Sequence, residues 1–408
     1  MMADQTIEPA FQEAISDSKI NGVIICASNT TGSFTYNYTA GARTLLSGES
    51  LPHKLDDILY LASGTKLIAS IAALQAKDDG HLSLDSPESI SKYAPELVNQ
   101  PILSSDGETV NPSTNAIALR QLLSQTSGLA YDFIVPYLLS WREKNQPPLQ
   151  PGHRRPVEKA FAHPLIFNPG TSWSYGPNLD WAGRILERAT NTTLGDHVRE
   201  RICKPLGIPT SDAQFFPVKG DEIRGRMVDL NPVDPEGLGL AVIGGMDVNK
   251  RSEGDFGGHG LFMTAEGYIK VLKSLLTNDE KLLKKETVEE MFSNQIGPEA
   301  EENAKAVFDG PTGVFYRAGA DGMKVGHGLG GLLTLEGVDG WYGERTLTWG
   351  GGLTFAWFVD RTNDLCGLCA IQASMPVQMQ TLTDLKNTFR HDIYRKYDAW
   401  KKGNPGKL

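Results

Sequence analysis

Strand-forming patterns lie at both ends of this 408-residue chain, and helical patterns fill its middle. Near the start, residues 22–28 and 32–41 read as two strands joined by a turn. Similar runs, rich in β-branched and aromatic residues, return late in the chain at 312–318, 331–335, 345–349, 354–360 and 365–373. Strands divided in this way predict one antiparallel sheet made from both ends of the chain.

Apolar residues at helical spacing predict helices between the strand groups and beside them. These fall at 8–20, 118–123, 135–143, 178–189, 264–276 and 379–400. We therefore expect an α/β (α+β) protein in which residues 1–80 and 250–408 form a sheet domain flanked by helices. Residues 81–249 are expected to form a mainly helical inserted domain, with a cleft at the junction. A hydrophobic fraction of 40% is enough to bury such a core.

Composition and terminal segments argue against several classes of protein. A formal net charge of -10 without a basic stripe argues against nucleic-acid binding. No run of residues is long and apolar enough to span a membrane, and the first twelve residues lack the apolar core of a signal peptide, so we expect a cytoplasmic protein. Gly406-Lys407-Leu408 loosely resembles a peroxisomal address, which is the alternative. Four scattered cysteines and no clustered ligands predict neither metal nor cofactor.

A hydroxyl and an amine lie three residues apart where a helix is expected to begin. Ser63-Gly-Thr-Lys66 is followed by apolar residues at helical spacing as far as Gly80. Three residues make nearly one helical turn, so Ser63 and Lys66 share a face and are close enough to share a proton. A lysine whose charged form is poorly solvated can act as the base that a serine nucleophile needs. A solvated lysine near an ordinary serine is the structural alternative.

Three further stretches accompany this pair. They read Leu-Leu-Ser-Gln-Thr-Ser-Gly-Leu at 122–129, Trp-Ser-Tyr-Gly at 173–176 and Trp-Gly-Gly-Gly at 349–352. With the Ser-x-x-Lys element and the Gly-rich segment 257–265, this ordered set resembles the serine hydrolases of the class C β-lactamase and penicillin-binding fold. It resembles more closely their esterase and fungal transesterase branch. The resemblance covers most of the chain and implies a β-lactamase/transpeptidase-like fold.

The resemblance also implies roles for individual residues. Ser63 is the expected nucleophile, Lys66 its proton acceptor and Tyr175 the acid/base partner, since a phenol can exchange a proton with the serine and then with the leaving alcohol. The backbone N–H groups of Ser63 and Gly352 are the expected oxyanion hole. On sequence alone, a packing tyrosine at the end of a loop is the alternative for Tyr175.

Two departures from the β-lactamase pattern bear on the substrate. Lactamases carry Lys-Thr-Gly on the edge strand, and its lysine helps to hold an anionic substrate, whereas this chain has Trp349, Gly350 and Gly351. An anionic β-lactam would therefore lose an ion pair. The usual Tyr-x-Asn is also broken, because Pro177 holds the place of the asparagine and Asn178 comes one residue later. Trp349 is expected to form a wall beside the backbone of Gly350 and Gly351, which the substrate approaches closely, and an aromatic wall without a cation suits a large, neutral or apolar acyl ester. A core tryptophan and a glycine bulge or turn are the structural alternatives.

Other aromatic and histidine residues are weaker candidates for the site. Phe133 and Tyr137 belong to an apolar stretch that would supply a hydrophobic lid over the substrate, although aromatics at this spacing are also typical of plain core. His259 and His327 each sit among glycines. Lining the cleft is one reading of them, whereas the commoner expectation for a loop histidine is that it is merely solvated.

The sequence therefore predicts a serine acyltransferase, or transesterase, of secondary metabolism acting on a polyketide-like substrate. An acyl group would pass from an ester or thioester through acyl-Ser63 to an alcohol. A carboxylesterase or lactonase is the first alternative, followed by a β-lactamase or peptidase and by a non-catalytic binding protein. The expected partners are a small-molecule acyl donor and an alcohol acceptor, with a carrier-protein domain as a further candidate donor.

Overall fold

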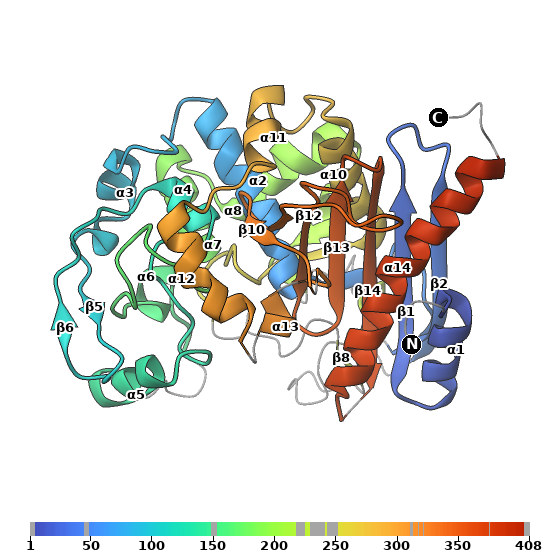
Figure 1. The fold of residues 1–408 in the computed structure, drawn as a ribbon, viewed down its shortest axis with the longest axis horizontal. Helices are drawn as coiled ribbons and strands as arrows, with labels where there is room; N and C mark the ends of the chain where they lie inside the picture. The colour runs from blue at the N-terminus through green and yellow to red at the C-terminus, as the bar shows by residue number, and fades with distance from the viewer. Residues whose placement is uncertain are drawn as a thin grey trace.

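An antiparallel sheet built from both ends of the chain forms one side of the molecule (Figure 1). The computed structural model describes residues 5–44, 49–147, 153–217, 225–228, 241–242, 252–310, 313–316, 318–320, 322–374 and 376–403. The strand order is β10-β11-β12-β13-β14-β1-β2-β3, and β8 also pairs with β14. The strands are β1 (Ile20–Ser28), β2 (Thr35–Thr44), β3 (Ser50–Pro52), β8 (Ala241–Val242), β10 (Val325–His327), β11 (Leu332–Thr334), β12 (Leu347–Gly351), β13 (Phe355–Asp360) and β14 (Leu365–Ser374). Because β14 pairs with both β13 and β1, it joins the two ends of the chain, as the sequence predicts.

Helices cover both faces of this sheet. In Figure 1, α14 (Met379–Gly403) crosses in front of the sheet beside α1 (Ile7–Ser16), and α10 (Ala265–Thr277) lies behind it, packed against β1, β13 and β14. The central strands are therefore buried on both faces, which explains why they read as continuous apolar runs rather than as an alternating pattern. Thr264 caps α10, since its hydroxyl accepts a hydrogen bond from the Gly267 N–H at 3.0 Å.

The middle of the chain forms a group of mostly short helices beside the sheet (Figure 1). The longest of these, α7 (Asn178–Thr190), packs against α2 (Thr65–Asp78). The others are α3 (Glu88–Tyr93), η2 (Pro95–Leu97), α4 (Leu119–Leu123), α5 (Pro136–Asn145), α6 (Val157–Ala160), α8 (Leu194–His197), η3 (Val198–Cys203), η4 (Lys204–Leu206) and η5 (Thr210–Asp212). After α10 come α11 (Lys285–Met291) and α12 (Pro298–Phe308).

Two small sheets lie within or next to this helical group. One has the order β4 (Ile58–Tyr60), β9 (Phe262–Thr264) and β7 (Ala213–Gln214), and the other pairs β5 (Ile102–Leu103) with β6 (Val110–Asn111). Thus β7, from the middle of the chain, pairs with β9 of the later segment. Domain boundaries at residues 80 and 250 remain a proposal. With these boundaries, the inserted segment contributes β7 to the small sheet with β9, and β8 to the large sheet beside β14.

One predicted strand is wrong. The segment 312–318 contains the single helical turn α13 (Gly313–Tyr316), and Ala318 after it has a left-handed φ of 48° that a strand does not accommodate. A short apolar run has no period that separates a strand from a helical turn, so the sequence pattern was ambiguous here. The largely unpatterned stretch 229–251 lies outside the described residues, apart from β8.

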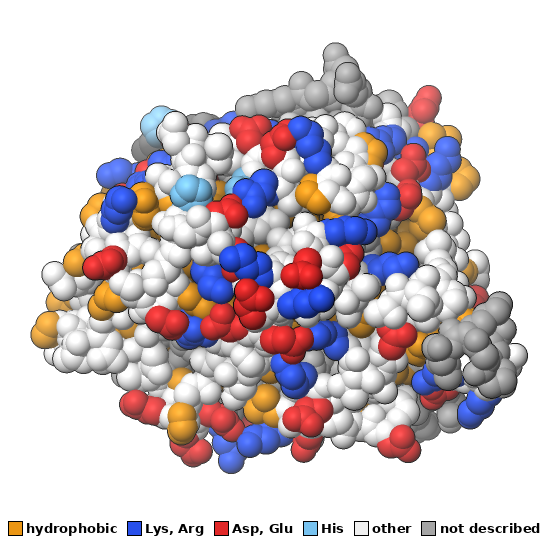
Figure 2. Space-filling view, turned by 90° about the horizontal axis from the view of Figure 1, so that it is seen from above, with side chains coloured by type: hydrophobic (Ala, Val, Ile, Leu, Met, Phe, Trp, Pro, Cys, Tyr) orange, Lys and Arg blue, Asp and Glu red, His pale blue; other side chains and the backbone are white. Residues whose placement is uncertain are grey.

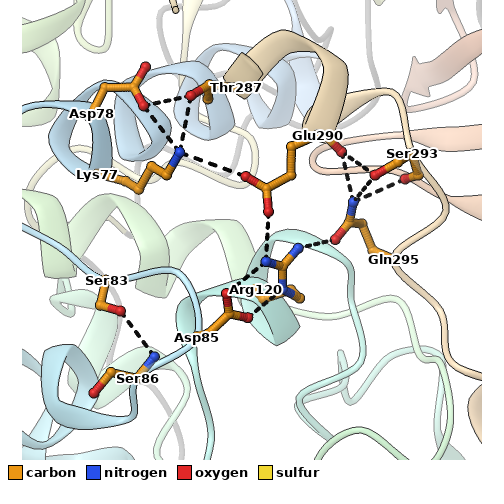
Figure 3. A network of polar contacts seen from close by, with 10 residues as sticks. All are labelled: Lys77, Asp78, Ser83, Asp85, Ser86, Arg120, Thr287, Glu290, Ser293 and Gln295. Carbon is orange, nitrogen blue, oxygen red and sulfur yellow. Dashed lines mark hydrogen bonds and ion pairs between the residues drawn. The ribbon is translucent and has the colours of Figure 1, made fainter.

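A network of charged and polar side chains joins three helices (Figure 3). Arg120 on α4 pairs with Asp85 at 2.6 Å and with Glu290 on α11 at 2.7 Å. Lys77, near the end of α2, donates to Thr287 at 3.1 Å and lies 3.7 Å from Glu290. Glu290 therefore links α2, which contains Lys66, to α4, which precedes the Thr-Ser-Gly motif.

The surface carries charges of both signs. Seen from above, Lys and Arg side chains are interspersed with Asp and Glu (Figure 2). Among the described helices, none combines the length and apolar character that crossing a membrane requires. All four cysteines, Cys26, Cys203, Cys366 and Cys369, are free and buried. The described part of the chain contains no group of three or more His, Cys, Asp or Glu side chains that could hold a metal ion.

Candidate active site

The candidate nucleophile lies on a constrained turn at the start of α2. Ser63 is the middle residue of the 3₁₀ turn η1 (Ala62–Gly64), and Ala62 before it has a left-handed φ of 45°, which an L-residue rarely adopts. The Tyr268 hydroxyl donates to the Gly64 carbonyl at 2.9 Å and holds the turn from the side of α10. Such strain persists only where the surrounding structure imposes it, and it is common at functional sites.

Lys66 lies one turn along α2, and its amine is surrounded by oxygen atoms. The side chain is only 2% exposed. Its Nζ donates to the Ser63 hydroxyl at 3.3 Å, to the Tyr131 hydroxyl at 3.3 Å and to the Gly258 carbonyl at 2.6 Å. The amine and the Ser63 hydroxyl are therefore in direct hydrogen-bond contact.

Tyr175 approaches Ser63 from the inserted segment. Its hydroxyl makes a short hydrogen bond with the Ser63 Oγ, and either oxygen can be the donor. The Lys66 Nζ lies over the Tyr175 ring, 4.6 Å from its centre. The structure thus brings Ser63, Lys66 and Tyr175 together, with the Ser63 hydroxyl bonded to both the amine and the phenol.

Behind Lys66 lies a buried carboxylate that the sequence analysis missed. Asp180, in the first turn of α7, accepts from the Tyr131 hydroxyl at 3.0 Å and from the Gly258 N–H at 2.9 Å, and its Oδ1 lies 3.5 Å from His259 Nδ1. Burial alone would raise the pKa of Asp180, but the hydrogen bond from His259 and the charges of His259 and Lys66 hold it below its ordinary value. Burial, together with the nearby Asp180, raises the pKa of Tyr131 well above its ordinary value.

An acidic residue in the first turn of a helix is usually explained by the helix dipole, so no sequence signal marked Asp180. The expectation that His259 is merely solvated is wrong, because it contacts this carboxylate.

Asn178, one residue after the place of the asparagine in Tyr-x-Asn, bonds to the segment 122–129. Its amide N–H donates to Gln125 Oε1 at 2.6 Å, and its Oδ1 accepts from the Ser127 hydroxyl. Both ends of the amide therefore bind the Thr-Ser-Gly segment and fix it to the start of α7. The described side-chain contacts of the Lys66 amine are the hydroxyls of Ser63 and Tyr131.

The glycine strand passes directly against the nucleophile's turn. A Cβ on Gly351, at the end of β12, would lie 2.1 Å from the Leu61 carbonyl oxygen and 3.1 Å from the Gly64 nitrogen. Gly352 follows with a left-handed φ of 54°. This approach supports the Ser63 and Gly352 N–H groups as an oxyanion hole, which we keep as a proposal.

The position of β12 in the sheet differs from the expected edge. β10 and β11 extend the sheet beyond it, so β12 is not the outermost strand. The pairs with β11 reach only as far as Thr348, whereas those with β13 continue to Gly351. In the described structure, residues 349–351 therefore have a sheet partner on one side only.

The family follows from comparison with known proteins. The family described as Beta-lactamase matches residues 7–382. The chain belongs to the β-lactamase family. A lovastatin esterase from Penicillium rubens is 53% identical over 403 residues, covering 97% of this chain and 99% of the relative. A monacolin J acid methylbutanoyltransferase from Aspergillus terreus is 34% identical over 401 residues, covering 96% and 95%.

A solved structure agrees with these relatives. A variant of simvastatin synthase from Aspergillus terreus superimposes with a TM-score of 0.82 at 32% identity, covering 96% of this chain and 97% of that one. The expected fold and the esterase and transesterase branch are confirmed. This β-lactamase-family chain is therefore a serine acyltransferase or hydrolase.

In this β-lactamase-family enzyme, aromatic rings back the candidate acid/base. The centre of the Trp349 ring lies 5.5 Å from that of Tyr175 and 6.0 Å from that of His327. Trp349 is only 6% exposed, so it packs as a wall beside Tyr175. The expectation that His327 is a solvated loop residue is wrong, because it belongs to β10 and is buried, and burial lowers its pKa to about 4.

The two candidate lid residues differ in their surroundings. Phe133 is 72% exposed, and its ring stacks on Tyr131 with the centres 5.0 Å apart. Tyr137, on α5, packs against a small apolar cluster that includes Leu138. Phe133 therefore lies beside Tyr131, which contacts Lys66. We propose that Phe133, rather than Tyr137, contacts the substrate.

Gly351→Ala is expected to lower turnover by about 10²-fold or more, because a misplacement of the nucleophile by about 1 Å costs this much. The new Cβ would lie 2.1 Å from the Leu61 carbonyl oxygen, so backbone must move against backbone. Gly297→Ala is the control, since its Cβ meets no atom within 4 Å. Turnover of an activated ester is the measurement, and equal rates for both variants would contradict the close approach of β12.

Proposed function

We propose that this chain transfers the acyl group of a hydrophobic ester to an alcohol through an acyl-Ser63 intermediate. The observation that carries this proposal is the Ser63 hydroxyl, bonded on one side to the Lys66 amine and on the other to the Tyr175 phenol. A nucleophile with a base and an acid at hydrogen-bond distance is the arrangement that acyl transfer needs.

Acylation begins with a proton transfer within this group. Lys66 Nζ, as the neutral amine, takes the proton of the Ser63 hydroxyl while Ser63 Oγ forms a bond to the ester carbonyl carbon. The N–H groups of Ser63 and Gly352 stabilise the oxyanion of the tetrahedral intermediate. The intermediate then releases the alcohol oxygen, which receives a proton from Tyr175, while the proton taken from Ser63 stays on Lys66.

Deacylation runs through the same groups in reverse. An acceptor alcohol gives its proton to the Tyr175 and Lys66 pair as its oxygen attacks the acyl carbonyl. The acyl–oxygen bond to Ser63 breaks, and the Ser63 oxygen regains its proton from Lys66. The net reaction exchanges one alcohol for another and needs no further reactant.

The substrate class follows from the relatives and from the wall of the site. Enzymes named for lovastatin and monacolin J acid act on esters of fungal secondary metabolism, and we extend that class to this chain. The exposed Phe133 offers apolar surface, and the largely buried Trp349 stands where β-lactamases have a cation. The proposed donor is a small ester or a thioester, including one held on a carrier-protein domain. The proposed location is the cytoplasm, and residues 406–408, on which a peroxisomal alternative rests, lie outside the described residues.

Hydrolysis is the second candidate, because the relative that is 53% identical is named an esterase. Water would then take the place of the acceptor alcohol and release the free acid. Both candidates share acylation and differ only in deacylation.

With an excess of a polycyclic acceptor alcohol, acylated product is expected to exceed free acid. A bound alcohol competes with water at a high effective concentration, provided that the cleft excludes or misorients water. The measurement is the ratio of the two products from one thioester donor and a panel of alcohols, with Ser63→Ala as the blank. If free acid dominates for every acceptor at every concentration, the enzyme is an esterase.

A further inference from the structure

We propose that Asp180 is a positioning residue that directs the Lys66 lone pair at Ser63, acting through Tyr131 and Gly258. The proposal rests on the roles of Ser63 and Lys66 in the proposed function. It concerns a carboxylate that has no described hydrogen bond to Ser63 or Lys66, so Asp180 acts through the groups that it holds and through its charge near Lys66.

The argument starts from which atoms can donate. An ionised carboxylate only accepts hydrogen bonds. The single hydrogen of the Tyr131 hydroxyl points to Asp180 Oδ2 at 3.0 Å, so the Tyr131 oxygen presents only lone pairs to Lys66, 3.3 Å away. The Gly258 carbonyl, 2.6 Å from Lys66 Nζ, is an acceptor by nature. Its own N–H is tied to Asp180 Oδ1 at 2.9 Å, which fixes the loop.

These acceptors determine the direction of the amine. A neutral amine has two N–H groups and one lone pair. Tyr131 and Gly258 take the two N–H groups, so the lone pair is left for the third neighbour, the Ser63 hydroxyl at 3.3 Å. After the proton transfer, the ammonium has three N–H groups and the same three oxygens accept them. The site therefore serves both states without reorganisation, which favours the transfer.

The surroundings of Asp180 fit a charged group in a buried place. The charged or titratable groups that face it are Lys66, His259 and Tyr131. His259 Nδ1 lies 3.5 Å from Oδ1. A Cβ on Gly258 would lie 2.2 Å from Oδ2, so glycine is required for the loop to come this close.

A purely structural role would look different from a positioning role, and Asp360 provides the comparison. Asp360 is also fully buried, and it accepts from a glycine N–H, that of Gly343, at 2.8 Å and from a tyrosine hydroxyl, that of Tyr394, at 2.6 Å. It lies at the end of β13 and has no described hydrogen bond to Ser63, Lys66 or Tyr175. Loss of its charge should therefore affect stability without affecting the amine.

Asp180→Asn is expected to lower kcat for an activated p-nitrophenyl ester by about 10²-fold, the cost of a misdirected catalytic group, with KM changed less than about 3-fold. The amide N–H of the new asparagine would donate to the Tyr131 oxygen and turn the Tyr131 hydrogen towards Lys66, where it competes with Ser63 for the lone pair. Asp360→Asn is expected to lose thermal stability but keep kcat. Equal kcat for the two variants would overturn the proposal.

Tyr131→Phe supplies the second arm and removes only one oxygen atom. Its kcat is expected to fall as in Asp180→Asn, and the double variant should be little worse than the poorer single, because both act on one amine. Losses that multiply would overturn the proposal. If Asp180→Asn does not fold, Tyr131→Phe decides alone, and an unchanged kcat overturns the proposal.

A mass measurement of acyl-Ser63 in the wild type distinguishes failure of the proposed function from failure of the proposed role of Asp180. A wild type without the adduct contradicts the proposed function itself. A wild type with the adduct, beside variants with unchanged kcat, contradicts only the role of Asp180.

Discussion

Ser63→Ala is expected to abolish the acyl-enzyme and to lower turnover of activated esters by at least about 10⁴-fold, as loss of a covalent nucleophile does elsewhere. The hydroxyl it removes is the atom that contacts both Lys66 and Tyr175, and no other group in the described site stands between them. The variant should still fold, because Ser63 is half-buried and loses a single oxygen. Rates with a p-nitrophenyl ester and the mass of the intact protein after incubation are the measurements.

Ser70→Ala is the matched control on the same helix. The Ser70 hydroxyl is fully buried and has no hydrogen-bond partner among the described residues, so its removal should leave turnover unchanged and stability unchanged or slightly higher. A Ser63→Ala protein that keeps wild-type rates, or that still gains the acyl mass, would place the nucleophile at another residue.

Much of the fold could be predicted because its signals are local. The apolar spacing of α14 and the continuous apolar run of β14 each follow from a single segment of sequence. The resemblance carried by the ordered motifs then predicted that the Ser-x-x-Lys turn, the Thr-Ser-Gly loop and the glycine strand share one site. The structure brings these segments together. Segment 312–318 shows the limit, since a short apolar run fits a strand and a helical turn equally well.

The parts of the site that were missed depend on contacts between distant segments. Asp180, Tyr131 and Gly258 come from three separate stretches, and only the packed structure shows that they meet around Lys66. His327 was misjudged for a related reason. Glycines on both sides predicted an exposed loop, but they allow the chain to pass close to its neighbours, and a Cβ on Gly328 would lie 2.5 Å from the Met291 carbonyl oxygen.

Lys66→Met and Tyr175→Phe are each expected to lower kcat by about 10²-fold or more, the usual contribution of a positioned base or acid. Methionine keeps most of the length of the lysine side chain while removing the amine, and phenylalanine keeps the ring that lies beside Trp349. The double variant is expected to be little worse than the poorer single, because the two groups act on one proton shared through Ser63. Steady-state kcat and the rate of acylation in a single turnover are the measurements.

The control for the phenol is Tyr316→Phe, because Tyr316 has its ring centre 5.9 Å from that of Tyr175, and its replacement removes a neighbouring hydroxyl while the aromatic packing remains. A loss confined to Tyr175→Phe would place the proton transfer at the oxygen that contacts Ser63. Losses that multiply between Lys66→Met and Tyr175→Phe would mean that the two groups serve different steps.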